Sequence, residues 1–192
     1  MARNANSVNI GKKPYHHGDL RAALITEGLT MLGESAGADS LSLRELARRV
    51  GVSAPSVYRH FPDKESLMTA LAEDGLKRLG AGQHEAAAAA GGGKEGFAAT
   101  GRAYVRFALA NPALYRLIFT SPLIAAYRVQ REERPEAMNF LLANVAAQMG
   151  SDPESRETRT AAVEAWALVH GLAMLMLDGQ IPADEALIDA VC

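Results

Sequence analysis

Apolar residues recur at helical spacing along most of this chain, and the alternation typical of strands is missing throughout. The pattern predicts an all-α protein. The expected helices cover residues 19–35, 42–50, 54–61, 63–79, 97–110, 113–119, 121–134, 135–149, 152–178 and 183–192.

The sharpest pattern lies in residues 42–67, where two short helices are joined by a tight turn. Ser42 is a suitable N-cap for the first helix, Glu45 can complete a capping box, and a glycine ends the helix. Ser53 caps the second helix, and Pro55 falls in its first turn, where a missing N–H costs little. Together these signals predict a helix-turn-helix.

The second of these helices has the features of a DNA-reading element. If Val57 and Phe61 face the core, the remaining side chains cover its outer surface, and none of them is acidic. Arginine, tyrosine and histidine there can donate hydrogen bonds to guanine or phosphate, and a lysine follows in the first turn of the next helix. The candidate contacts are Ala54, Pro55, Ser56, Tyr58, Arg59, His60 and Lys64. The competing interpretation is a three-helix core with an ordinary basic face.

The segment GVSAPSVYRHFPDKESL, residues 51–67, resembles the signature of the TetR family. In that signature a Gly-Val-Ser turn leads into a recognition helix ending in Tyr-x-His-Phe, followed by x-x-Lys-Glu-x-Leu. The resemblance covers about residues 15–75 and implies a bacterial DNA-binding regulator, usually a repressor that a small molecule releases. It places operator contacts, mostly to the DNA backbone, at Ser42, Ser53, Ser56, Tyr58, His60 and Lys64. Ala54 and Pro55 fall where other members carry base-reading side chains, so direct readout is expected to be sparse.

The remaining residues lie before and after the helix-turn-helix region, which we call the head. The amino-terminal residues are polar and basic, and we expect Lys12, Lys13 and Tyr15 to lie along DNA as an arm. Three successive glycines from Gly91 are expected to make residues 80–96 a flexible junction. The expected segments are a flexible basic arm (1–17), a helix-turn-helix domain (18–62), a linking helix (63–80) and a carboxy-terminal effector-binding and dimerisation domain (95–192).

His170 lies four residues after Trp166 on an otherwise apolar helix face, and two interpretations stand for it. It is either a polar anchor in an effector pocket or a core histidine that fixes helix packing. The candidate pocket residues are Tyr104, Tyr115, Phe119, Met138, Trp166, His170 and Met174. The same stripe of aromatic and methionine residues is also what a plain core would contain.

The helix expected over residues 152–178 is apolar on nearly all its faces, so both of its sides must be buried against other apolar surfaces. One side would meet the core, and the other a second subunit. The segment from Trp166 to Gly171, closing in Leu177-Asp178-Gly179, resembles the WHG-type carboxy-terminal domain found behind many TetR heads. That resemblance implies a homodimer in which residues 152–178 and 183–192 form a two-fold four-helix interface.

Composition and charge agree with a cytoplasmic DNA-binding protein. Hydrophobic residues make up 48% and charged residues 22% of the 192 residues, as in soluble globular proteins. Residues 1–64 carry a net charge of +3 and residues 65–192 a net charge of −5, which suits a protein that presents one end to a polyanion. The single cysteine, Cys192, excludes an internal disulfide. Neither a signal peptide nor an apolar run long enough for a membrane span is apparent.

Catalytic, cofactor and metal motifs are absent from the sequence. It has no Gly-x-Ser-x-Gly elbow, no Cys-x-x-Cys and no phosphate-binding glycine loop, and the His16-His17 pair lacks further ligands at metal-binding spacing. We therefore expect a homodimeric transcriptional regulator that binds an operator and a small-molecule effector, without a cofactor. The alternatives are a small-molecule binding protein with only non-specific DNA affinity and, third, an enzyme.

Overall fold

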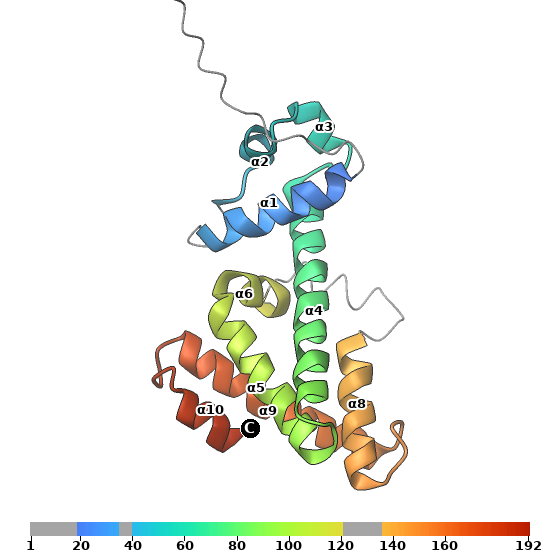
Figure 1. Cartoon of the computed structure of the whole chain (residues 1–192). Coiled ribbons are helices and arrows are strands. Elements are labelled where there is room, and N and C mark those ends of the chain that lie inside the picture. Colours follow the sequence, from blue (N-terminus) through green and yellow to red (C-terminus); the bar gives the residue numbers. More distant parts are fainter. Residues whose placement is uncertain (1–18, 35–39, 121–135) are drawn as a thin grey trace, which may run out of the picture.

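The computed structural model describes residues 19–34, 40–120 and 136–192, and the regular structure within these ranges is helical (Figure 1). A small helical head lies at one end of the molecule. The long helix α4 (Lys64–Ala89) runs down from it, and the remaining helices pack around the lower part of α4. The predicted all-α architecture is confirmed.

The head consists of α1 (Leu20–Glu34), α2 (Leu43–Val50) and α3 (Ala54–Tyr58), which share one apolar core. Val57 is fully buried and Phe61 is 2% exposed, as the sequence pattern requires. The second helix is shorter than the expected range 54–61, because it ends at Tyr58 and Phe61 follows it. The helix-turn-helix packing predicted from the sequence is therefore confirmed.

The caps of α2 explain how the turn is made. The Ser42 hydroxyl accepts a hydrogen bond from the N–H of Glu45 at 3.4 Å. The expected capping box is only half formed, because the Glu45 carboxylate binds arginines of its own helix instead. At the other end, Gly51 adopts φ 79° and donates its N–H to the carbonyl of Ala47, a left-handed conformation that glycine adopts without strain.

Helix α4 is longer than the sequence pattern predicts. It begins with a capping box, in which the Asp63 carboxylate accepts from the N–H of Ser66 at 2.7 Å and the Ser66 hydroxyl accepts from the N–H of Asp63 at 3.4 Å. It then continues through Ala89 instead of ending near Leu79. The expected end of the linking helix was therefore wrong, because the alanine run favours helix strongly enough to carry it on.

The flexible junction expected over residues 80–96 was also wrong. Only Ala90, Gly91 and Gly92 separate α4 from α5 (Gly93–Ala110). Two of the three successive glycines lie in this turn, where Gly91 and Gly92 have φ of 79° and 73°, and Gly93 begins α5. A tight turn, not a loose linker, therefore joins the two helices.

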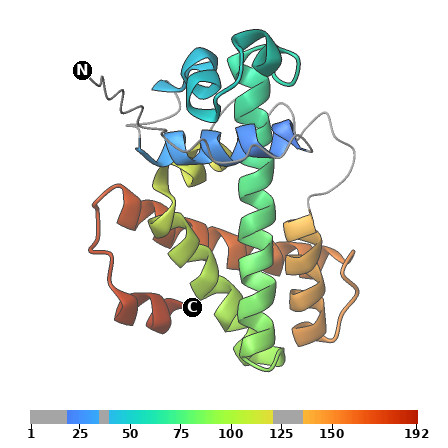
Figure 2. The same cartoon turned by 45° about the horizontal axis from the view of Figure 1, so that its top comes forward.

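The body is built from α5 and the helices that follow it. These are α6 (Pro112–Thr120), α8 (Glu136–Met149), α9 (Arg156–Leu177) and α10 (Glu185–Val191). Figure 2 shows α9 crossing behind α4 and α5, with α8 and α10 on opposite sides of the body. The helix expected over residues 121–134 lies outside the described residues.

Two large apolar residues of the body are exposed. Met149, at the end of α8, is 47% exposed, and Val163 of α9 is 56% exposed. Helix α9 turns the face carrying Ala162 and Ala173 toward the core. Helical spacing alone does not say which side of an apolar helix is covered.

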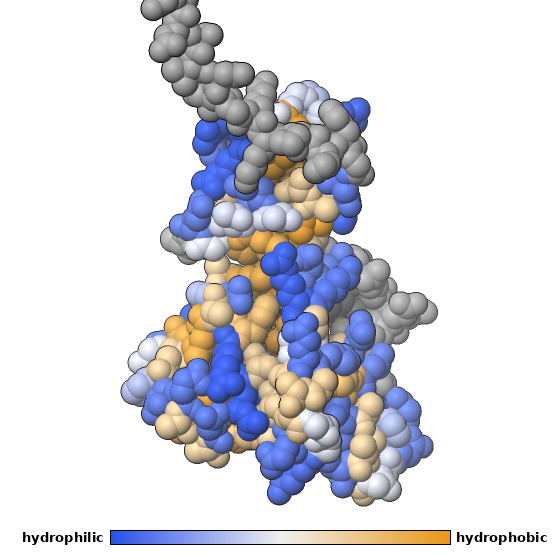
Figure 3. All heavy atoms as spheres, viewed as in Figure 1, coloured by the Kyte–Doolittle hydropathy of each residue, from blue (hydrophilic) through white to orange (hydrophobic). Residues whose placement is uncertain are grey.

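Helix α6 belongs to both parts of the molecule. Leu114, Leu117 and Ile118 are buried in the core that the head shares with α4. Tyr115, on the same helix, is fully buried in the core of the body. Figure 3 shows hydrophobic residues gathered at the waist between α1 and α6. The head is thus packed directly onto the body as well as being connected to it through α4.

Candidate functional site

The candidate DNA contacts lie in α3, in the residues that flank it, and at the starts of α2 and α4. Tyr58 is 43% exposed, and Pro55, Arg59 and His60 are exposed as well. Ala54, Ser56 and Lys64 are half-buried. Helix α3 carries no acidic side chain, so its outer surface is compatible with phosphate.

Hydroxyl groups at the start of α3 are paired with each other. The Ser53 and Ser56 hydroxyls lie 2.8 Å apart, and Ser53 makes no side-chain capping bond. The Arg59 guanidinium donates to the Ser56 hydroxyl at 3.4 Å, a long and therefore weak bond. A phosphate oxygen that accepted from Arg59 would therefore replace only a weak contact.

Some predicted contacts lie outside the described residues. These are Lys12, Lys13 and Tyr15 of the expected arm, whose DNA contacts stay predictions. The pair His16-His17 also lies outside the described residues. Within the part of the chain that the structure describes, no three His, Cys, Asp or Glu side chains cluster to hold a metal ion.

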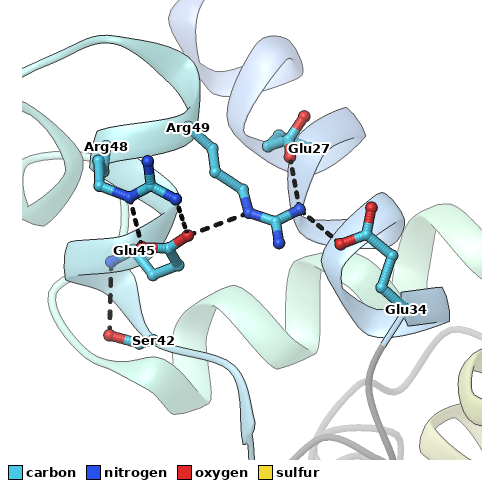
Figure 4. Close-up of polar contacts among 6 residues, drawn as sticks. All are labelled: Glu27, Glu34, Ser42, Glu45, Arg48 and Arg49. Atoms are coloured by element: carbon cyan, nitrogen blue, oxygen red, sulfur yellow. Dashed lines mark hydrogen bonds and ion pairs between the residues drawn. The ribbon is translucent and has the colours of Figure 1, made fainter.

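Two arginines of α2 are occupied by carboxylates (Figure 4). Arg48 donates to Glu45 at 2.6 and 2.7 Å. Arg49 donates to Glu45 at 3.2 Å and reaches α1, where it meets Glu34 at 2.6 Å and Glu27 at 3.3 Å. Hydrogen bonds from Arg48 and Arg49 lower the pKa of Glu45 from 4.5 to about 2. Arg49 thus ties α2 to α1, and the two arginines add no net positive charge to the head because three glutamates pair with them.

This network was not expected from the sequence, although part of it has a local signal. Glu45 stands three and four residues before Arg48 and Arg49, the spacing at which helix side chains meet. The pairing of Arg49 with α1 carries no such local signal.

The body contains a cavity of about 170 Å³. Its wall is formed by α4, α5, α6, α8, α9 and the end of α10. Four of the predicted effector residues line it, namely Tyr104, Phe119, Met138 and Trp166, whereas Tyr115, His170 and Met174 do not. The missed wall includes Leu76, Leu79 and Gln83 of α4, Phe140 and Asn144 of α8, and Cys192. Since α4 was expected to end near Leu79, its contribution to a pocket had no support in the sequence pattern.

A hydrogen-bonded cluster connects the cavity wall to α6. The Nδ1 atom of His170 lies 2.8 Å from the Tyr104 hydroxyl and 2.7 Å from the Tyr115 hydroxyl. The two hydroxyls are 3.2 Å apart, and the Trp166 indole N–H donates to the Tyr104 oxygen at 3.2 Å. Phe119 packs edge-on against the His170 ring, with 5.1 Å between centroids.

This cluster favours a neutral histidine. Nδ1 can accept a tyrosyl O–H only when it carries no proton. Burial lowers the pKa of His170, which favours the same state, and burial and the neighbouring Tyr104 raise the pKa of Tyr115. Tyr104 and Trp166 line the cavity, whereas His170 lies outside its lining and contacts both of them. Of the two interpretations of His170, these contacts favour the core residue.

Helix α10 closes one end of the cavity through Val191 and Cys192. Arg106 of α5 holds this short helix, donating to Glu185 at 2.7 Å and to Asp189 at 3.2 Å. Burial raises the pKa of the Cys192 thiol.

One side of α9 leaves apolar residues uncovered. Val163, Leu168 and Leu175 are 56%, 52% and 47% exposed. Among the described helices, α9 is the one that would qualify as a membrane span by length and composition, with 22 residues and a mean hydropathy of 1.5. The sequence pattern did not predict a possible span here, and core helices of soluble proteins pass the same test. In the described structure 22% of that stretch is buried, and Val163, Leu168 and Leu175 are its exposed large apolar side chains.

Two family descriptions match the chain, one for each part of it. Residues 25–71 match "Bacterial regulatory proteins, tetR family". Residues 97–191 match "Tetracyclin repressor-like, C-terminal domain". The first range spans most of the head and the start of α4, and the second spans most of the body.

Similar proteins agree with these descriptions. A solved structure from Rhodococcus sp. RHA1, described as a protein with unknown function, is 33% identical with a TM-score of 0.71, covering 94% of this chain and 93% of that one. A variant of TetR from Acinetobacter baumannii AYE, in complex with minocycline, is 23% identical with a TM-score of 0.58 over 88% of each chain, a likeness of fold alone.

Curated sequences share a shorter stretch. The class G tetracycline repressor of Vibrio anguillarum is 42% identical over 57 residues, which span 30% of this chain and 27% of that protein. The chain thus spans about a quarter of the length of the tetracycline repressors that it matches. With a matched head, a matched body and a similar structure along nearly the whole chain, this protein belongs to the TetR family of DNA-binding transcriptional regulators.

Proposed function

We propose that this protein is a homodimeric repressor that binds a near-palindromic operator and is released by a small-molecule effector. The observation that carries the proposal is the position of α6. One face of α6 packs in the head core, and Tyr115 of the same helix is bonded to two residues of the cluster behind the cavity wall. The family is one of regulators without enzymatic activity, so the enzyme alternative is set aside.

In the DNA complex, α3 of each subunit would enter the major groove. Two such helices fit half-sites about 34–36 Å apart, one turn of the duplex. Tyr58, His60 and Lys64 would donate to phosphate, and Arg59 to phosphate or guanine. Ala54 and Pro55 offer no hydrogen-bond donors to the bases, so sequence preference would depend on Arg59 and on the shape of the operator.

The open face of α9 supports dimerisation through the carboxy-terminal helices. Val163, Leu168 and Leu175 form its exposed apolar part, and the small Gly171 has nothing within 4 Å of where a Cβ would lie. A second α9 could therefore approach closely. Leu168→Glu combined with Leu175→Glu should yield a monomer in sedimentation analysis, whereas Met149→Glu, at an equally exposed methionine of α8, should stay dimeric. An unchanged dimer in the double variant would reject this interface.

Effector release would operate through α6. A ligand in the cavity touches Tyr104 and Trp166, whose cluster includes Tyr115, and a shift of α6 would move the leucines that support α1 and α4. The coupling free energy need only be about 1–3 kcal/mol to make a useful switch. The minocycline complex of the Acinetobacter relative supports a ligand-holding body in this fold and does not identify the ligand of this chain. As a soluble regulator of DNA, the protein would act in the cytoplasm.

The experiment that tests the proposal is selection of binding sites from a random duplex pool, followed by titrations at two salt concentrations. Enrichment of a palindrome whose half-sites lie one turn apart, bound far more tightly than scrambled DNA, is the expected result. Binding that fades with salt and prefers no sequence would instead favour the alternative, a small-molecule binding protein with non-specific DNA affinity.

Variants of the head test the docking. Tyr58→Ala or Lys64→Ala should weaken binding to all sequences alike, and Lys64→Ala should reduce the slope of log K against log salt by about 0.9. Lys94→Ala, which removes the same charge from an exposed position on α5, is the matched control and should change neither quantity. Unchanged affinity in Tyr58→Ala or Lys64→Ala would contradict the proposed docking.

A further inference from the structure

The described wall of the cavity carries no charged side chain. Its residues are apolar or neutral, and no Asp, Glu, Lys or Arg is among them. The Cys192 thiol stays protonated because burial raises its pKa. Arg102 and Arg106, the two cations that influence that thiol, are both paired with carboxylates of α10: Arg102 lies 3.7 Å from Asp189, and Arg106 donates to Glu185 and Asp189. A charged ligand would therefore lose hydration here without meeting an opposite charge.

The volume of the cavity sets the size of the part of a ligand that it encloses. An apolar protein cavity of about 150 Å³ is known to accept benzene. The cavity of this protein, at about 170 Å³, is slightly larger. A single substituted ring fits this space.

Two aromatic residues of the wall use their polar atoms within the hydrogen-bonded cluster. The Trp166 N–H is used on the Tyr104 hydroxyl, and that hydroxyl also lies within bonding distance of Tyr115 and His170. The ligand would therefore meet ring surface at Tyr104 and Trp166. Thr100 is similar, because its hydroxyl donates to the Phe97 carbonyl at 2.6 Å.

Two amides differ from these groups because they keep unused hydrogen-bonding capacity. Gln83 of α4 donates one N–H to the Thr100 carbonyl at 3.3 Å, and Asn144 of α8 donates one N–H to the Phe140 carbonyl at 2.8 Å. A primary amide has a second N–H and a carbonyl oxygen beyond such a bond. Since Gln83 and Asn144 come from different helices, they can approach a ligand from two walls of the cavity.

We infer that the effector is an uncharged, mostly apolar molecule that places about one ring in this cavity and carries a hydroxyl, carbonyl or amide that Gln83 and Asn144 bind. This inference rests on the proposed regulator function only for the word effector. The cavity and its selectivity can be measured without DNA.

Three probes with one cyclohexyl ring test the charge selectivity: cyclohexylmethanol, cyclohexanecarboxylate and cyclohexylmethylammonium. Trp166 is the single tryptophan of the chain and lines the cavity, so its fluorescence reports occupancy in the full-length protein. The alcohol should bind saturably, and both ions should bind at least about 100-fold more weakly at neutral pH. The carboxylate should gain affinity as the pH is lowered toward its own pKa, because the acid form is neutral.

Each binding result either supports or overturns the inferred ligand class. Equal or tighter binding of either ion would overturn the inferred ligand class, and so would absence of saturable binding by the alcohol. Neither result depends on whether the head selects an operator, so a failed effector class and a failed regulator assignment are distinguishable.

The role of the amides is tested with matched variants. Gln83→Leu and Asn144→Leu should each weaken cyclohexylmethanol by about fivefold, the effect of one hydrogen bond, while leaving methylcyclohexane bound as tightly or more so. Gln148→Leu makes the same kind of change at an exposed position of α8 and should alter neither probe. Equal losses for the alcohol and the hydrocarbon would show that the amides only shape the cavity, which would overturn their assignment.

Discussion

Replacing Gly75 with alanine adds one methyl group where α4 passes α6. A Cβ at this position would lie 2.7 Å from Ile118 Cδ1 and 2.8 Å from Leu114 Cδ1, both on α6. These side chains are 1% and 7% exposed, so they have little room to move aside. Overpacking of this kind costs about 1–3 kcal/mol. Alanine in place of glycine inside a helix returns about 0.8–1.0 kcal/mol.

Gly82→Ala is the matched control in the same helix. Nothing lies within 4 Å of a Cβ at position 82, so this variant should gain stability by up to about 1 kcal/mol. Because the gain in helix propensity is common to both variants, their difference measures the packing cost alone. We expect Gly75→Ala to be about 1–3 kcal/mol less stable than Gly82→Ala.

Urea unfolding followed by circular dichroism would measure this difference, at one fixed protein concentration because dimer stability depends on concentration. If the two variants differ by less than about 0.3 kcal/mol, within ordinary additivity error, the tight contact between α4 and α6 is refuted. If α6 carries the signal from cavity to head, Gly75→Ala should also change operator affinity, and Gly82→Ala should not.

Three further predictions concern polar groups. Tyr115→Phe removes a buried hydroxyl from the cluster with His170 and should cost about 0.5–1.5 kcal/mol in chemical unfolding; a neutral effect would contradict the hydrogen bonds assigned to it. Burial lowers the pKa of His170 below 6.5, so the neutral histidine contributes stability that is present above pH 6.5 and is lost as the pH falls below that value. The variant His170→Phe should therefore flatten this part of a plot of Tm against pH. An unchanged slope would reject the assignment. The pKa of Glu45 is about 2 instead of 4.5, so this carboxylate contributes stability that is present above pH 4.5 and is lost as the pH falls toward 2. The variant Arg49→Met should raise the pKa of Glu45 in a carboxyl NMR titration. An unchanged pKa would assign the whole shift to Arg48.

The sequence predicted the head well because its signals are local. Ser42 and Gly51 mark the ends of α2, and Val57 and Phe61 follow the spacing of one buried face. Each signal acts within a few residues, so tertiary contacts have little opportunity to override it. The same is true of the exposed side chains of α3, which are those left over once the buried ones are removed.

The extent of α4 shows where local reasoning fails. A run of alanines and a group of glycines oppose each other, and the sequence alone does not say where one prevails. The structure resolves the conflict with helix to Ala89 and a turn of three residues. Since α4 packs against α5 and α8 over its lower part, burial adds to the helix propensity there.

The sequence by itself determined an all-helical chain, the helix-turn-helix and the residues that its reading helix exposes, because helical spacing and capping residues encode these features locally. It also indicated that residues 152–178 are apolar on more than one side. Only the tertiary structure decided which side of α9 is open, which helices enclose the cavity, and that Tyr104 and Tyr115, 66 and 55 residues before His170 in the chain, meet at its Nδ1. Contacts over such separations arise from how whole helices pack, and no periodicity in the sequence records that choice.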